Sequence, residues 1–128
     1  MTTRTTITTS KAPAAIGPYS QAVMTGNTLF SSGQIPVDPQ TGKMREKNID
    51  DQTRQVFGNI DAILREAGMT FENVITTTVF LADMNDFPRF NELYAGYFET
   101  TYPARSCVEV SRLPKDSLIE IEVIARKD

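Results

Sequence analysis

The chain has 128 residues, of which 40% are hydrophobic and 23% are charged. These values are ordinary for a globular protein and exclude a disordered or fibrous chain. The length suits a single domain over residues 1–128 that buries about two-thirds of the surface its unfolded chain exposes. Thirteen Lys and Arg against sixteen Asp and Glu give a net charge of −3, and the basic residues are scattered. The sequence therefore does not favour nucleic acid as a partner.

Histidine is absent, and the only cysteine is Cys107. Without histidine, Ser-His and Cys-His catalysis and the usual zinc ligand sets are excluded, so we expect no metal and no cofactor. A single cysteine cannot form an intrachain disulfide, which fits a reducing compartment. We find no apolar segment of signal-peptide length at the N-terminus and no run long enough to span a bilayer. We therefore expect a cytoplasmic protein that does not enter the membrane.

The first third of the chain predicts three strands. β-Branched residues predict a strand at 5–9, and the prolines and glycines that follow end it. Strands at 20–25 and 28–32 flank Gly26-Asn27, a two-residue signal for a β-hairpin in which positive φ is favoured. Residues 36–42, rich in Pro and Gly, then predict an irregular crossing.

The rest of the chain alternates between helical and strand periodicity. Asn48 is a candidate N-cap for a long amphipathic helix that Gly68 would end. A second helix is predicted from Asp86, with Pro88 in its first turn and an aromatic stripe that is more typical of a core than of a cofactor site. The remaining strands are predicted at 74–81, 106–110 and 118–125.

Six strands and two helices in the order βββαβαββ predict an α+β fold, with a single six-stranded mixed sheet and both helices packed on one face. In the last strand, Ile119, Ile121 and Val123 alternate with Glu120 and Glu122, so one side is core and the other is mixed. The mixed side also carries apolar residues. Burial by self-association is favoured over a solvated face, and clefts between subunits become candidate sites.

The clearest chemical pattern lies between residues 102 and 123. It places Arg105, Cys107 and three glutamates on two strands that a tight turn at 113–116 should pair. A guanidinium can hold a carboxylate through two parallel hydrogen bonds, and a glutamate can orient or deprotonate a water. The pattern predicts a hydrolytic site for a small acid. The alternative is that these charges only solvate the sheet and pair with each other.

Two of the candidate residues have a structural alternative of their own. A lone cysteine in a strand is most often a small buried hydrophobe, and no histidine exists to activate Cys107 as a nucleophile. A neighbouring Arg105 can still lower the pKa of the thiol and make it reactive toward electrophiles without any catalytic role. Tyr19, which follows Gly17-Pro18, can anchor a loop simply by packing its ring.

Four segments resemble the RidA/YjgF family of reactive intermediate deaminases. They are residues 12–21, 32–36, 103–108 and 113–115, in the family's order and over nearly the whole chain. The resemblance implies a chorismate-mutase-like fold and a homotrimer whose sheets form a central barrel, with three sites between subunits. It also implies hydrolysis of 2-iminobutanoate and 2-iminopropanoate, formed from the enamines of serine and threonine dehydratases, to 2-oxo acids and ammonia.

The resemblance further implies roles for individual residues. Glu120 and Arg105 match the catalytic pair, in which the arginine binds the substrate carboxylate and the glutamate directs a water as a base or protonates the imine. The implied substrate-binding residues are Arg105, Cys107 through its backbone N–H, Tyr19, Ser32 and Gly33. Two other classes remain open. One is a ribonuclease or translation inhibitor, which the acidic balance disfavours, and the other is a non-catalytic trimer that binds 2-oxo acids or related metabolites, or acts as a chaperone.

Overall fold

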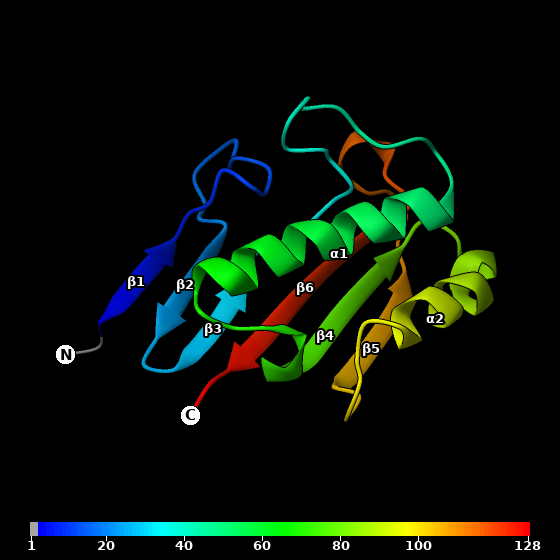
Figure 1. The fold of residues 1–128 in the computed structure, drawn as a ribbon. Helices are drawn as coiled ribbons and strands as arrows, with labels where there is room; N and C mark the ends of the chain where they lie inside the picture. The colour runs from blue at the N-terminus through cyan, green and yellow to red at the C-terminus, as the bar shows by residue number, and fades with distance from the viewer. Residues whose placement is uncertain (1–2) are drawn as a thin grey trace.

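A six-stranded mixed sheet organises the chain in a computed structural model that describes residues 3–128 (Figure 1). The strands are β1 (Arg4–Ile7), β2 (Ala22–Thr25), β3 (Thr28–Ser31), β4 (Val74–Leu81), β5 (Ala104–Glu109) and β6 (Ile119–Arg126), and the helices are α1 (Ile49–Glu66) and α2 (Phe87–Ala95). The strand order is β1-β2-β3-β6-β4-β5, and every pair is antiparallel except β4 and β5. The predicted α+β class and its element order are confirmed.

The expected pairing of the last two strands is wrong. β4 lies between β5 and β6, and it pairs with both. The reason is that α2 is the crossover of a parallel β4–α2–β5 unit, which places β5 at the outer edge of the sheet. The chain then crosses the end of β4. Val110 N donates to Leu81 O at 2.9 Å, and Ala82 N donates to Leu118 O at 3.0 Å, so the connection to β6 is bonded to β4 at both of its ends.

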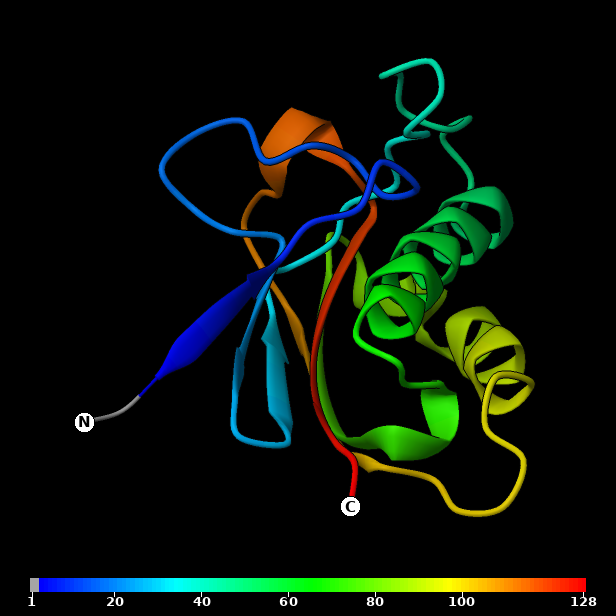
Figure 2. The same cartoon turned by 60° about the vertical axis from the view of Figure 1, so that its left-hand side comes forward.

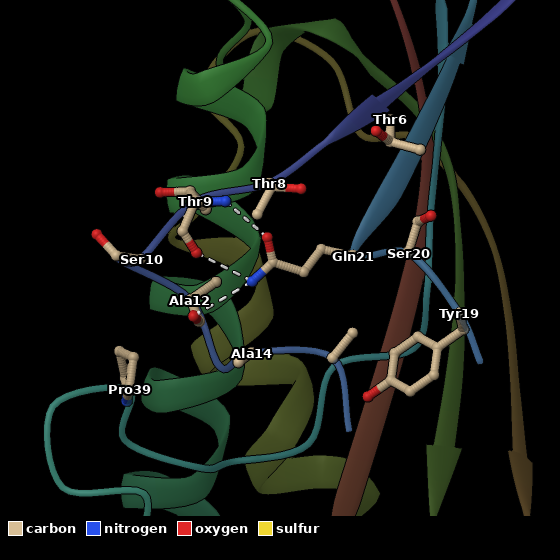
Figure 3. Close-up of a pocket in the computed structure, with 11 residues that line it drawn as sticks. Thr6, Thr8, Thr9, Ser10, Ala12, Ala14, Tyr19, Ser20, Gln21 and Pro39 are labelled. Atoms are coloured by element: carbon tan, nitrogen blue, oxygen red, sulfur yellow. Dashed lines mark hydrogen bonds between the residues drawn. The ribbon is translucent and has the colours of Figure 1, made fainter. Parts of the chain in front are cut away.

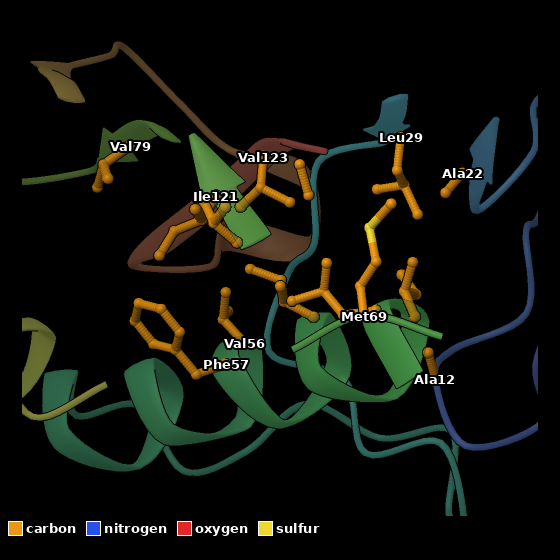
Figure 4. Close-up of a cluster of buried hydrophobic side chains, with 14 of the residues drawn as sticks. Ala12, Ala22, Leu29, Val56, Phe57, Met69, Val79, Ile121 and Val123 are labelled. Atoms are coloured by element: carbon orange, nitrogen blue, oxygen red, sulfur yellow. The ribbon is translucent and has the colours of Figure 1, made fainter. Parts of the chain in front are cut away.

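Helix α1 begins and ends where the sequence predicts. The Asn48 side chain accepts a hydrogen bond from Asp51 N at 2.8 Å, and Gly68, just beyond the helix, has φ of +74°. Its apolar face is buried against β6 and β4 (Figure 4). Each of the fully buried side chains, among them Phe57 and Ile60, contributes about 1.5–3 kcal/mol through the hydrophobic effect.

Helix α2 covers the end of the same face with aromatic rings. Phe90 and Tyr94 are buried, and the Tyr94 hydroxyl is 2.8 Å from the Thr77 hydroxyl on β4. The Phe57 and Tyr97 rings stack at 4.0 Å between centroids, which ties α1 to the segment after α2. The aromatic stripe is therefore largely core, as the sequence indicates.

Among residues 3–128, no α-helix covers the second face of the sheet (Figure 2). Along β6, Ile119, Ile121 and Val123 are buried under α1, whereas Glu120 and Glu122 lie on this open face, which confirms the predicted alternation. Elsewhere the predicted strand 5–9 ends at Ile7, because the residues after it are held by a different set of hydrogen bonds, described below. No helix in the described part of the chain is long and apolar enough to cross a bilayer.

Candidate active site

Arg105 lies on the edge strand β5, on the face that the helices cover. It is in register with Thr77 of β4, which is buried under α2. Its guanidinium carbon is 4.7 Å from the centroid of the Tyr94 ring and 5.2 Å from that of Phe87. These are favourable cation–π distances, so the rings hold the positive charge without neutralising it.

The guanidinium has most of its hydrogen-bonding capacity left. Nη1 donates to the Asn91 side chain at 2.8 Å, and Arg105 takes part in no ion pair among residues 3–128. It opens into a pocket of about 420 Å³ whose walls include Asn91, Tyr94 and Tyr102, which we call the arginine pocket. Because a guanidinium has five N–H groups in a planar fork, this pocket suits a small carboxylate.

Glu120 lies on the open face of the sheet. It is in register with Phe80 of β4, and it lines a hollow of about 670 Å³ together with Tyr19, Ser32 and Gly33. We call this the glutamate pocket. Burial and, to a smaller extent, the neighbouring Glu122 raise the pKa of Glu120 above its ordinary value. A raised pKa makes the carboxylate a stronger proton acceptor and brings its acid form closer to neutral pH.

Gly33 is required by the close approach of this carboxyl group. A Cβ built at Gly33 would lie 2.8 Å from the carboxyl carbon of Glu120, and closer still to one oxygen. Any side chain here would displace the Glu120 carboxylate. The φ of Gly33 is not in the left-handed region, so it is the lack of a side chain that matters.

Gln21 fixes the loop that carries Tyr19 (Figure 3). Its side chain is 4% exposed and makes four hydrogen bonds: it accepts from Thr9 N at 2.7 Å and donates to the carbonyls of Thr9, Ala12 and Pro13 at 3.0, 3.3 and 2.8 Å. Its backbone carbonyl accepts from Ser32 N at 2.9 Å. These hydrogen bonds end β1 at Ile7 and connect the loop to Ser32, which lines the glutamate pocket.

Tyr19 and Ser32 both line this pocket. The Ser32 hydroxyl donates to Ser20 O at 2.6 Å, and the Tyr19 hydroxyl accepts from Ile16 N at 3.4 Å. The Tyr19 ring is 52% exposed, so it covers the pocket edge more than it packs. The structure thus brings Tyr19, Ser32, Gly33 and Glu120 together in one pocket.

Arg105 does not join them within one chain. Arg105 is in register with Thr77 of β4, three positions before Phe80, the partner of Glu120. The two residues lie on strands separated by β4 and on opposite faces of the sheet. One chain therefore carries the two groups in two separate pockets. The arginine pocket and the glutamate pocket share no lining residue.

Cys107 lies on the same face as Arg105, in register with Val79, and is half-buried. Burial raises the pKa of its thiol by more than the charge of Arg105 lowers it. Arg105 thus lowers the pKa of the thiol, as the sequence indicates, but burial outweighs this effect and the net shift is upward. The backbone of Cys107 lies on the outer strand of the sheet, which has a neighbour on one side only.

Sequence reasoning missed two residues of this region. A polar residue on a helix that carries an aromatic stripe looks solvated in sequence, and only the fold brings Asn91 to Arg105. Gln21 was seen as part of a motif and not as a buried hub. Its position directly before strand β2, after a loop rich in Pro and Gly, is the sequence feature that could indicate a residue holding this loop.

Comparison with known proteins assigns the family. A family model described as Endoribonuclease L-PSP matches residues 9–127. The chain belongs to this family. A RutC family protein of Pyrococcus horikoshii is 60% identical over 122 residues, which cover 95% of this chain and 97% of that protein. The 2-iminobutanoate/2-iminopropanoate deaminase of Homo sapiens is 48% identical over 122 residues, which cover 95% and 89%.

The fold of the family is also the fold of this chain. The crystal structure of E. coli TdcF with bound serine superposes with a TM-score of 0.93 at 48% sequence identity, and the match covers 97% of this chain and 99% of that one. The RidA/YjgF resemblance carried by the sequence motifs is therefore confirmed, and so is the fold that it implies.

The contact between Gly33 and Glu120 generates a first prediction. In Gly33→Ala the methyl group should push the Glu120 carboxyl towards solvent, so its pKa should move back towards the ordinary value of an exposed glutamate. The measurement is a carbon NMR titration of the Glu120 carboxyl. Gly58→Ala is the matched control, because a Cβ there meets no atom within 4 Å. An unchanged Glu120 titration in Gly33→Ala would contradict this account.

The pKa of Glu120 also predicts how stability changes with pH. Folding raises this pKa, so the protonated form of Glu120 favours the folded state. This contribution to the free energy of unfolding is fully present below the unfolded pKa, near 4.5. It is lost as the pH rises through the folded pKa. Glu120→Gln should therefore gain stability relative to the wild type between pH 4 and pH 7, as measured by denaturant unfolding at a fixed protein concentration.

Glu72 supplies a control of opposite sign. Hydrogen bonds from Thr100 and Glu99 lower the pKa of Glu72, so its contribution is present above its unfolded pKa and is lost as pH falls through the folded one. Glu72→Gln should lose stability relative to the wild type at pH 7 and approach it at low pH. Parallel profiles for the two variants would refute the assigned pKa directions.

Proposed function

We propose that the protein hydrolyses small 2-imino acids to 2-oxo acids and ammonia. The observation that carries the proposal is the pair of half-sites: a guanidinium free of ion pairs among the described residues, and a carboxyl group with a raised pKa beside an open pocket. The name of the human relative supports this substrate class. The serine bound in the TdcF structure is itself a small amino acid with a carboxylate.

We also propose that the active unit is a homotrimer with each site formed between two subunits. Arg105 and Glu120 face opposite sides of one sheet, so a site that uses both needs the arginine pocket of one subunit and the glutamate pocket of its neighbour. The open face also presents Phe30 and Val108, which are 44% and 45% exposed, and apolar residues of this kind favour burial against a second copy.

The proposed chemistry follows from the two groups. Arg105 binds the substrate carboxylate through two N–H groups and thereby holds the imine carbon near Glu120. Protonated Glu120 donates to the imine nitrogen, and the resulting carboxylate accepts a proton from the water that attacks the carbon. The carbinolamine that forms transfers its hydroxyl proton to the nitrogen, by way of Glu120, and collapses to the 2-oxo acid and ammonia. The raised pKa of Glu120 suits it to both directions of transfer.

Two other functions are separable by experiment. The family description names an endoribonuclease, and incubation with RNA followed by gel analysis tests that activity directly. A metabolite-binding trimer would use the same pockets without turnover.

We propose the cytoplasm as the site of action, because a lone cysteine suits a reducing compartment.

A pair of variants separates binding from catalysis. Glu120→Gln keeps the size and hydrogen bonding of the side chain but removes its basicity, so hydrolysis should fall by about 100-fold or more while affinity for 2-oxobutanoate stays within about threefold. Arg105→Lys keeps the charge but loses the planar fork, so the affinity for 2-oxobutanoate should fall by at least about tenfold. Binding is measured by calorimetry, and turnover by ammonia release from a threonine dehydratase reaction.

Arg65→Lys is the matched control for the arginine. Arg65 pairs with Asp61 on the exposed side of α1, so its replacement should change neither affinity nor rate. A rate of hydrolysis in Glu120→Gln equal to that of the wild type would rule out the proton-transfer role of Glu120. A wild-type protein that binds 2-oxobutanoate but releases ammonia no faster than buffer would establish the binding-only alternative.

A further inference from the structure

A second hollow adjoins the glutamate pocket. It has a volume of about 440 Å³ and shares four wall residues with that pocket: Ile16, Tyr19, Ile35 and Pro114. Its other walls include Val37 and one charged residue, Lys115, but no acidic, amide, serine or threonine side chain lines it. We call it the apolar pocket. The glutamate pocket, by contrast, is lined by two serines and two glutamates.

The shared walls mean that a ligand held beside Glu120 can extend into the apolar pocket. A 2-imino acid has its carboxylate and its side chain on the same reacting carbon. If Arg105 of one subunit takes the carboxylate and Glu120 of another faces the carbon, the side chain is the only part left to enter an apolar space. A methyl group is comparable in size to a water molecule, which occupies about 30 Å³ of liquid, so the apolar pocket has room for much more.

The wall of this pocket is fixed before any ligand enters. Val37 N donates to Ile35 O at 2.8 Å, and Val37 O accepts from the side chain of Asn59, a fully buried residue of α1, at 3.0 Å. On the other side, Pro114 begins a short turn in which Lys115 and Asp116 have φ of 56° and 55°. Two adjacent non-glycine residues in the left-handed region hold an unusual backbone shape at the pocket edge.

We propose that the apolar pocket binds the substrate side chain, and that the preferred substrates are 2-imino acids with extended apolar side chains such as isobutyl. This inference rests on the proposed function of the same site. It assigns the side-chain selectivity to a preformed wall of loops, separate from the residues that bind the carboxylate and move protons. The preference follows because every additional methylene group leaves water for a largely apolar wall.

The test compares two imines made in place. An amino acid oxidase converts alanine or leucine to the corresponding 2-imino acid, and trapping with semicarbazide reports how fast the protein removes each one. We expect kcat/KM for the leucine-derived imine to be at least about tenfold higher than for the alanine-derived imine. Equal or lower efficiency with the leucine-derived imine, while the alanine-derived imine is hydrolysed, would overturn the inference and leave the proposed function standing.

A matched pair of substitutions locates the effect. Val37→Thr keeps the shape of the wall but adds a hydroxyl, so it should lower the leucine-to-alanine ratio by at least about threefold with little effect on the alanine-derived imine. Val74→Thr is the control, because Val74 is as buried as Val37, at 7% exposure, but lines neither pocket. The same ratio in both variants would place the selectivity elsewhere and refute the assignment.

A binding measurement keeps the inference distinct from the chemistry. If neither imine is hydrolysed, the proposed function fails, and calorimetry with 4-methyl-2-oxopentanoate and pyruvate decides the subsite alone. Tighter binding of the longer 2-oxo acid, reduced in Val37→Thr and retained in Val74→Thr, would support the apolar pocket as a side-chain subsite. Equal affinity for the two would overturn it.

Discussion

The insertion of β4 between β5 and β6 is the constraint on which the rest of the structure depends. It separates Arg105 on β5 from Glu120 on β6 by one strand, and the register then places them on opposite faces. The same insertion gives Arg105 a covered, aromatic surrounding and leaves Glu120 on a face that no helix covers. Within a single chain, the Arg105 guanidinium and the Glu120 carboxyl therefore cannot contact the same small molecule.

Each half-site is organised before a ligand arrives. The Arg105 guanidinium is positioned by Asn91 and by the aromatic rings of α2, so little conformational entropy remains to be lost when a carboxylate binds. On the other face, Gly33 leaves space for the Glu120 carboxyl, and Gln21 holds the loop above it. Each half takes its charge from a side chain, because a guanidinium supplies the cation and burial tunes the acid.

Local chemistry made part of this structure predictable from the sequence. The cap at Asn48, the turn at Gly26, the stop at Gly68 and the alternation along β6 each depend on neighbouring residues, and all four were found as predicted. The strand pairing was not, because a period of two assigns the face of a residue but does not identify the neighbouring strand. Sequence order favours pairing successive strands, but β6 pairs with β3 and β4 and not with the preceding strand β5.

For the candidate site too, local motifs identified some residues and long-range contacts determined the rest. Family motifs named Arg105, Glu120, Tyr19, Ser32, Gly33 and Cys107, and four of these line one pocket. The buried hydrogen bonds of Gln21 and the contact of Asn91 with Arg105 connect residues 8 to 14 positions apart, and no local pattern encodes them. The pKa of Cys107 depends on how burial balances a nearby charge, which the sequence does not give.

The most direct measurement for a site shared between subunits is activity after mixing two inactive variants, Arg105→Ala and Glu120→Gln, by joint unfolding and refolding. In a mixed trimer, an intact site forms where the arginine of one subunit meets the glutamate of the other. Random equal mixing then restores about a quarter of the wild-type activity. No recovery, with mixed trimers demonstrated by native mass spectrometry, would contradict a site built from the opposite faces of two subunits.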